Sequence, residues 1–159
     1  MKLNILLLLA LFVVAVPSMQ AQGVRSGPDP ATIRDPDLER DSLHNFEVAK
    51  NYFKLKKAYV ASLKRCEEII AGNPNFAKIE EVLLMAGQSS IWLSQNKGKQ
   101  HPDLYVSFEG GEKRTLTSAQ FLEMGRLYLN KLVSEYPDGS FAKQAQEELR
   151  ALDEAAKKQ

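Results

Sequence analysis

The chain has 159 residues, and its 21 basic and 20 acidic residues leave a formal net charge of +1 at neutral pH. This balance provides neither the basic excess expected of a nucleic-acid-binding protein nor an acidic tract for calcium. The single cysteine, Cys66, excludes an internal disulfide framework, so the fold must rely on a hydrophobic core.

Residues 1–21 predict a signal peptide. Lys2 supplies a positive charge, and residues 5–16 form an unbroken apolar run that is too short to span a bilayer comfortably. Ala21 offers a small residue for cleavage, and the alternative is an uncleaved membrane anchor. No cysteine closely follows the apolar run, so the sequence predicts no lipid anchor. We therefore expect an exported protein that is soluble and periplasmic after cleavage.

Residues 22–40 are rich in Pro, Asp and Gly and predict a flexible leader, with a partner-binding tail as the alternative. A helical domain is expected over residues 41–158. Asp41 or Ser42 fits the N-cap of its first helix, which ends at a short connection at residues 56–58. Apolar side chains recur at helical spacing along this first helix: Leu43, Phe46, Val48, Ala49, Tyr52, Phe53 and Leu55.

A second amphipathic helix starts at Tyr59 and ends near Gly72, which favours a left-handed cap, and Pro74, which prevents continuation. The same stop recurs at Tyr136-Pro137, and after each proline a helical pattern restarts at a Phe-Ala pair. Such punctuation is typical of stacked helical hairpins, which bind other proteins more often than they catalyse reactions. The expected inward positions of the second helix are Leu63, Cys66, Ile69 and Ile70.

A third helix is predicted over residues 77–95, and residues 97–116 then break the helical pattern. In this insert, Tyr105 and Phe108 favour a strand, and the two glycines that follow can turn the chain. We expect either a small β-hairpin or an irregular loop, because an isolated hairpin is marginal in water.

Thr117 and Gln120 fit a capping box at the start of a fourth helix, which ends at Tyr136. Ser140 can cap a fifth helix, whose apolar stripe is narrower and whose opposite face is charged. These properties are expected of a terminal capping helix in a repeat array. The stripe consists of Phe141, Ala145, Leu149 and Leu152.

The residues that could carry chemistry do not form a recognisable site. His44 and His101 are far apart, and no second cysteine can complete a zinc site. Cys66 lies on an apolar helix face, which favours a buried structural thiol. The adjacent glutamates at 67–68 and 80–81 diverge by about 100° on a helix, so neither pair forms an acid–base dyad. The sequence therefore predicts no catalytic residue, metal or cofactor, and we do not expect an enzyme.

The second helix resembles a known repeat. In the tetratricopeptide repeat (TPR), an aromatic residue opens this helix, small residues lie inside it and a proline closes it. Ala49 and Tyr52 fit the small and aromatic positions of the first helix, with one extra residue in the turn. The 63 residues from Pro74 to Pro137 correspond to one repeat of roughly 34 residues plus an insert of about 29. The matching positions of the second helix are Tyr59, Ser62, Cys66, Ile69 and Pro74.

Residues 132–149 look like the repeat-closing pattern of the BamD-like family, the helical-repeat lipoproteins of the outer-membrane β-barrel assembly machinery. The repeat region of the cell-division coordinator CpoB (YbgF-like) ends its repeats similarly. This chain lacks the lipid-attachment cysteine of BamD proteins and has fewer repeats. The residues that carry this second resemblance include Tyr136, Pro137, Phe141 and Ala145.

The resemblance implies an all-α, TPR-like fold of two helical hairpins and a C-terminal capping helix, interrupted by the insert at 97–116. It implies a non-catalytic scaffold for a protein or peptide partner in the cell envelope, with outer-membrane protein assembly as the family-level expectation. The alternative is an accessory protein that buries a small hydrophobic ligand under the insert.

Two surfaces are candidates for the partner. In TPR-like arrays the first helix of each pair lines a groove, which makes Lys50, Phe53 and Lys54 candidates there. The lysines would hold a peptide carboxylate and Phe53 would supply apolar contact, unless these residues are ordinary surface and core. In the insert, Tyr105 and Phe108 would be exposed anchors or fold back as a lid.

Overall fold

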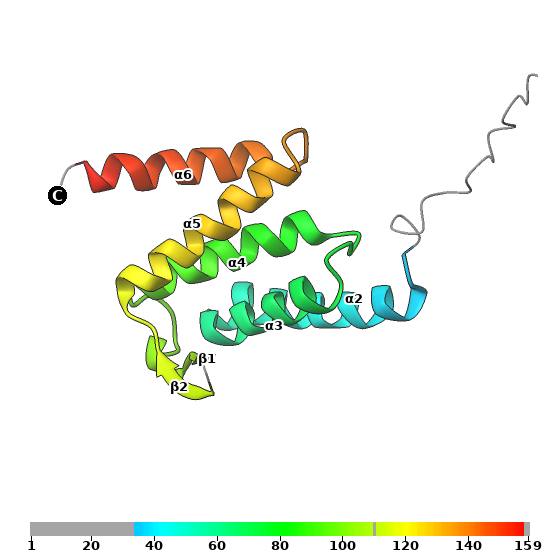
Figure 1. Ribbon diagram of the computed structural model, residues 1–159, viewed down its shortest axis with the longest axis horizontal. Coiled ribbons are helices and arrows are strands. Elements are labelled where there is room, and N and C mark those ends of the chain that lie inside the picture. The colour runs from blue at the N-terminus through cyan, green and yellow to red at the C-terminus, as the bar shows by residue number, and fades with distance from the viewer. Residues whose placement is uncertain (1–33, 110, 158–159) are drawn as a thin grey trace, which may run out of the picture. The chain divides into compact units, whose positions relative to one another are not determined.

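The computed structural model describes residues 34–109 and 111–157, so the predicted signal peptide and residues 22–33 lie outside the described residues. The described part is mainly helical, as predicted, and contains five α-helices and a two-stranded antiparallel sheet (Figure 1). The helices are α2 (Pro36–Lys50), α3 (Tyr59–Gly72), α4 (Ile79–Ser94), α5 (Ser118–Glu135) and α6 (Ala142–Ala156).

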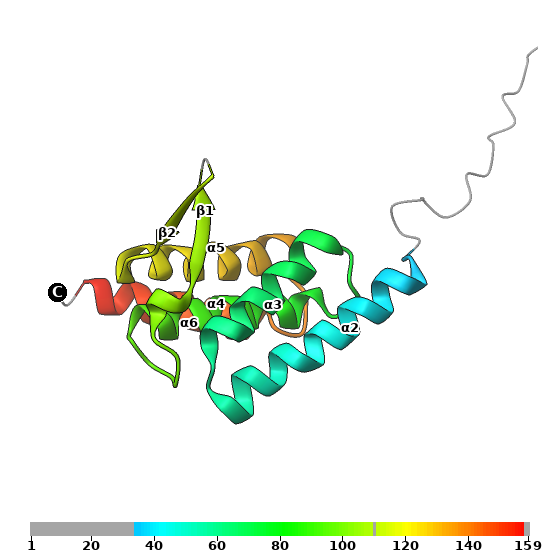
Figure 2. The ribbon, with the colours of Figure 1, turned by 90° about the horizontal axis from the view of Figure 1, so that it is seen from below.

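Each of these helices packs against the next one along the chain, α2 on α3, α3 on α4, α4 on α5 and α5 on α6 (Figures 1 and 2). The central helix is α4, because 11 of its 16 residues are buried. The core between the helices includes the fully buried side chains of Phe46, Leu63, Leu83, Phe121 and Leu132.

The first helix begins earlier than predicted. Asp35 is its N-cap, and the Asp35 carboxylate accepts hydrogen bonds from the backbone amides of Asp37 (2.8 Å) and Leu38 (3.3 Å). Proline is favoured in the first helical turn, so Asp-Pro is itself a helix start. The predicted N-cap at Asp41 or Ser42 is therefore wrong, and residues 36–40 of the predicted leader are helical.

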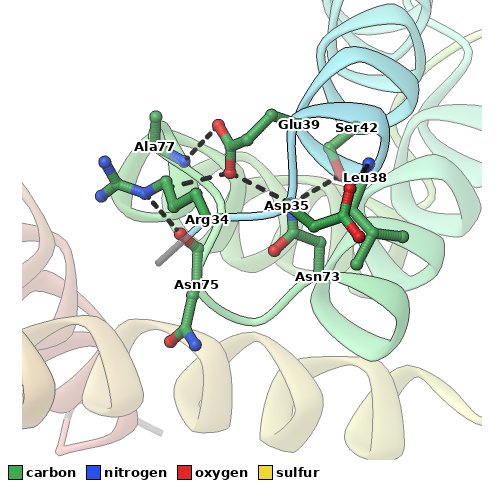
Figure 3. A network of polar contacts seen from close by, with 8 residues as sticks. All are labelled: Arg34, Asp35, Leu38, Glu39, Ser42, Asn73, Asn75 and Ala77. Atoms are coloured by element: carbon green, nitrogen blue, oxygen red, sulfur yellow. Dashed lines mark hydrogen bonds and ion pairs between the residues drawn. The ribbon is translucent and has the colours of Figure 1, made fainter. Parts of the chain in front are cut away.

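A polar network joins the start of α2 to the first proline turn (Figure 3). The Glu39 carboxylate accepts hydrogen bonds from Asn73 Nδ2 (3.1 Å) and from the backbone amide of Ala77 (3.3 Å). Arg34 Nε donates to the carbonyl oxygen of Asn75 (2.9 Å), and Asn73 Nδ2 also donates to the buried hydroxyl of Ser42 (3.1 Å). The turn that separates α3 from α4 is thus held by side chains of α2 and of Arg34, which precedes it.

We expect Glu39→Ala to lower the free energy of unfolding by about 1–2 kcal/mol, because two hydrogen-bond donors in the turn lose their acceptor. Urea unfolding followed by circular dichroism measures the change. The control is Asp41→Ala, whose side chain is 75% exposed and should change stability by less than about 0.5 kcal/mol. Equal effects of the two substitutions would contradict a structural role for the network.

The apolar face of the first helix is narrower than predicted. Phe46 and Ala49 are buried as expected, but Leu43 and Leu55 are exposed. Leu55 lies in a π-helical turn, η2 (Asn51–Lys56), which follows α2 directly. A π-helical turn holds more residues than an α-helical one, so it shifts later side chains away from the face set by a 3.6-residue period. The chain then leaves the helix at Lys57, which has a left-handed backbone (φ 49°).

The insert forms the β-hairpin rather than the irregular loop. Strands β1 (Val106–Glu109) and β2 (Glu112–Thr115) pair with Phe108 opposite Lys113, and a short 3₁₀-helix, η3 (Pro102–Leu104), precedes them. Gly111 in the turn has a positive φ of 86°, which glycine adopts without strain. Figure 2 shows the hairpin projecting away from the helices.

The start of the insert caps α3. No side chain at the N-cap position of α3 bonds to its free amides, but the backbone amide of Ala61 donates to Gln100 Oε1 (2.9 Å). The amide of Lys99 also donates to the carbonyl oxygen of Lys57 (2.9 Å). Residues 99–100 are therefore attached to the first helix pair, although they lie far along the chain from it.

The sequence predicts the termini of the other helices correctly in part. The predicted capping box at Thr117 and Gln120 is confirmed at the start of α5. The predicted cap at Ser140 is wrong, because Phe141 occupies the N-cap position of α6 and its half-buried ring packs on the core. The left-handed cap predicted at Gly72 is also wrong, since Gly72 is the last residue of α3 and Asn73, with a negative φ of −143°, is the C-cap.

Candidate partner-binding groove

Three pockets follow one another along α4 and α6. The first pocket, of about 180 Å³, is lined by residues of η2, α4 and α6. The second pocket, of about 280 Å³, lies between α4 and α6 and shares Gln88 with the first. The third pocket, of about 300 Å³, also borders the start of α5 and shares Gln95 and Leu152 with the second. We call the first and second pockets together the α4–α6 groove.

Aromatic side chains make one wall of the groove rigid. The ring of Phe53 stacks on Trp92 with 4.8 Å between ring centroids, and Tyr59 packs against both rings at 5.6 Å and 4.5 Å. Phe53 lines the first pocket and Trp92 lines the second. The η2 turn positions Phe53 here, so the end of the first helix contributes directly to the groove.

A polar bridge connects lining residues of the first and second pockets. Gln88 Nε2 of α4 donates to Glu148 Oε1 of α6 (2.5 Å), and Gln144 Nε2 donates to the same oxygen (3.1 Å). Each glutamine uses its amide nitrogen in the bridge, and within residues 34–109 and 111–157 neither amide oxygen accepts a hydrogen bond. These oxygens can accept hydrogen bonds from a ligand.

The predicted lysines are placed differently. Lys54 lines the first pocket, and within the described part of the chain it forms no ion pair. Lys97 at the second pocket likewise has no carboxylate partner there. Lys50 instead pairs with Glu47 (3.2 Å) and lies over the Phe46 ring, outside the three pockets. The structure therefore places Phe53 and Lys54 in the groove and leaves Lys50 beside it.

The two aromatic candidates of the insert, Tyr105 and Phe108, differ in burial. Tyr105 is 6% exposed, and its ring meets the edge of Phe121 with 5.4 Å between centroids. Phe108 is 75% exposed on the projecting hairpin. Tyr105 thus anchors the insert to the helices, whereas Phe108 is available to solvent.

Sequence reasoning missed Glu67, which holds Tyr105 in place. The Glu67 carboxylate accepts hydrogen bonds from the hydroxyls of Tyr105 (2.8 Å) and Tyr128 (3.0 Å), so it joins α3, the insert and α5. Burial raises the pKa of Glu67, against the opposing effect of the two tyrosine hydrogen bonds and of Lys64. Tyr105 and Tyr128 are 23 residues apart and give no local signal for this contact, which forms only when α3, the insert and α5 come together in the fold.

Stability should depend on pH through Glu67. A carboxyl whose pKa is higher in the folded state binds protons more readily when folded, so its contribution is complete at low pH and declines as the pH rises through the folded pKa. We expect Glu67→Gln, which keeps an oxygen acceptor for both tyrosines, to gain stability relative to the wild type as the pH rises from 4.5, the ordinary value, to neutral. Urea unfolding of both proteins across this range tests the expectation, and parallel curves would contradict it.

Most of the residues that match the TPR pattern are buried. Ala49, Ser62, Cys66 and Ala145 are fully buried. The Ser62 hydroxyl donates to the carbonyl oxygen of Ala49 (3.2 Å), so the two small positions of the first helix pair meet. Burial raises the pKa of the Cys66 thiol well above its ordinary value. Of the remaining matched residues, Tyr59 and Ile69 are buried, Tyr52, Tyr136 and Phe141 are half-buried, and Pro74 and Pro137 are exposed.

Among the helices that the structure describes, none is both long and apolar enough to cross a membrane. Within residues 34–109 and 111–157, no group of three or more His, Cys, Asp or Glu side chains is arranged to hold a metal ion.

Comparison with protein-family models, with curated proteins and with solved structures found no match to this chain.

Proposed function

We propose that this protein is a non-catalytic, TPR-like interaction scaffold that holds a segment of a partner protein in the α4–α6 groove. The observation that carries the proposal is that three alternating segments, η2, α4 and α6, line the first pocket together. The TPR resemblance implies this placement, because the first helix of each pair lines the groove in such arrays. Phe53 and Lys54, two of the residues expected there, are among its lining residues.

The chemistry of the groove supports recognition of a polypeptide. Its walls combine aromatic and aliphatic side chains with side-chain amides, two lysines (Lys54 and Lys97) and two glutamates (Glu81 and Glu148). Apolar pockets hold side chains, and amide oxygens bond to the backbone of a bound segment. The groove therefore offers charged side chains of both signs to a bound segment.

The location and the cellular role of the scaffold are proposed from the sequence. Residues 1–21 support export to the periplasm, where the protein would meet partners in the cell envelope. The similarity of residues 132–149 to the repeat-closing pattern of the BamD-like family supports a role in outer-membrane protein assembly. A small hydrophobic ligand under the insert has less support, because the Tyr105 ring packs there against Phe121.

The proposal is tested by reversing one charge in the groove. We expect Lys54→Glu to reduce capture of envelope proteins after crosslinking in cells, while leaving stability within about 0.5 kcal/mol of the wild type. The matched control is Lys143→Glu on α6, whose side chain is 89% exposed and lies outside the three pockets. Identical sets of captured proteins for the wild type and both variants would refute groove binding.

A further inference from the structure

Two lysine-containing segments that are far apart in the sequence meet at the start of α3. The end of η2 and the residue after it supply Lys56 and Lys57, and the loop after α4 supplies Lys97 and Lys99. The backbone amide of Lys99 donates to the carbonyl oxygen of Lys57 (2.9 Å), so the two segments are in direct contact. Figure 2 shows η2 on the side of the helices away from the hairpin. The fold therefore gathers four lysines that neither segment would supply alone.

Close packing fixes the backbone of both segments. Gly98 lies between the two lysines of the second segment, and a Cβ atom there would be 2.5 Å from Tyr59 Cδ2. The backbone amide of Ala58 donates to the carbonyl oxygen of Tyr52 (2.9 Å), and Lys56 Nζ lies 5.1 Å from the centroid of the Tyr52 ring. The lysines therefore project from an ordered backbone, so little further backbone entropy is lost when they bind a partner.

The two segments contain no carboxylates of their own. Residues 48–66 and 82–102, which include both segments, have no Asp or Glu. All four lysines are exposed, and within residues 34–109 and 111–157 none of them forms an ion pair. Positive charge thus accumulates here, although the net charge of the whole chain is only +1.

Carboxylates on neighbouring elements do not cancel this charge. Glu47 of α2 already pairs with a lysine of its own helix (3.2 Å). Three other carboxylates belong to the groove lining or to η3: Glu81, Glu148 and Asp103. Even when all three are counted, the five lysines of residues 54–57 and 97–99 outnumber them. An excess of positive charge therefore remains at this end of the molecule.

The most exposed leucine of the described residues lies in the first segment. Leu55 is 76% exposed, because the π-helical turn directs it away from the core, and Lys54 and Lys56 flank it. An exposed apolar side chain among lysines suits the boundary between water and a lipid bilayer, where the apolar group enters the membrane and the ammonium groups stay at the lipid phosphates. A soluble acidic polypeptide or a nucleic acid would pair with the lysines but would leave Leu55 without a comparable apolar environment.

We propose that this basic surface, formed by Leu55, Lys56, Lys57, Lys97 and Lys99, docks the protein on a lipid bilayer that contains anionic lipids. The four ammonium groups lie at the lipid phosphates, and the Leu55 side chain enters the outer part of the acyl region. One leucine buries far less apolar area than a lipid anchor, so the attachment is reversible and depends on salt. The basic surface is separate from the role of Lys54 in the groove.

Cosedimentation with lipid vesicles tests this proposal. Purified protein is mixed with vesicles of phosphatidylcholine alone or with vesicles that also contain phosphatidylglycerol, which carries a negative charge. We expect at least roughly tenfold tighter binding to the anionic vesicles, and loss of this preference in about 1 M NaCl, where the Debye length is about 3 Å. Equal binding to both kinds of vesicle at low salt would overturn the proposal.

Two matched double variants connect binding to the basic surface. Lys56→Gln with Lys99→Gln should weaken binding to the anionic vesicles roughly thirtyfold, because each lysine near an anionic bilayer contributes about a fivefold change in affinity. Lys113→Gln with Lys143→Gln removes two exposed lysines elsewhere and should change binding by less than about twofold. Both variants lose the same net charge and keep residues 1–21 unchanged, so equal weakening by the two would overturn the assignment to this surface.

The exposed leucine distinguishes a bilayer from a soluble acidic partner. Leu55→Ala should weaken binding to the anionic vesicles roughly three- to tenfold, whereas Leu127→Ala, on α5 and 67% exposed, should leave it unchanged. Soluble polyglutamate should compete poorly with the vesicles. Equal effects of the two leucine variants, together with tight binding of polyglutamate, would overturn the proposal and identify an acidic polypeptide as the partner. None of these variants alters Lys54, so the results are independent of the groove test.

Discussion

Replacing Phe121 by alanine should lower the free energy of unfolding by about 3–5 kcal/mol, the largest loss that we expect from a single substitution in this chain. The Phe121 side chain is fully buried on α5, and its ring contacts Tyr105 of the insert. Its removal leaves a cavity where α5 and the insert meet the core. Urea unfolding followed by circular dichroism measures the loss, which is a large part of the stability of a typical domain.

Leu127→Ala is the matched control for Phe121. Leu127 lies on the same helix but is 67% exposed, so the substitution should change stability by less than about 0.5 kcal/mol. A loss below about 1 kcal/mol for Phe121→Ala would contradict the packing of the insert against α5 through Tyr105.

Replacing Gly125 by alanine should destabilise the protein by about 1–3 kcal/mol, although alanine is the better helix former. The helices α4 and α5 approach closely at Gly87 and Gly125. A Cβ atom on Gly125 would lie 2.7 Å from Ile91 Cγ1 and 3.0 Å from the carbonyl oxygen of Gly87. The backbone oxygen cannot move aside as the end of a flexible side chain can, so the two helices must separate.

The control for this helix crossing is Gly72→Ala. Gly72 is the last residue of α3, has no atoms within 4 Å of an added Cβ and should give equal or higher stability as alanine. Thermal and urea unfolding of both variants give the comparison. A gain in stability for Gly125→Ala would show that the α4–α5 crossing is looser than described.

Local patterns predicted most of the secondary structure. Helical spacing and the two prolines located the five helices, and Thr117 with Gln120 marked the start of α5 correctly. These features succeed because capping and periodicity involve residues only a few positions apart. The first helix begins earlier than the sequence predicts, because Asp and Pro residues are typical of flexible segments, whereas Asp35-Pro36 here is a helix start.

The contacts between distant segments could not be predicted. Gln100 caps α3 across 39 residues, and Gln88 meets Glu148 across 60. Neither glutamine has a sequence signal that distinguishes it from a surface residue. The repeat pattern predicts Phe53 as a groove residue, and Phe53 does line the first pocket, but the polar bridge depends on how α4 and α6 approach each other.

Site-specific photocrosslinking from α6 tests the central claim, that the α4–α6 groove holds the partner. Gln144 lines the first pocket, whereas its neighbour Lys143 points to solvent with its side chain 89% exposed. A photoreactive residue at position 144, introduced in cells, should form a defined adduct with an envelope protein that Lys54→Glu diminishes, and the same probe at 143 should form little. Equal adducts at both positions, or a stronger adduct at 143, would contradict the account.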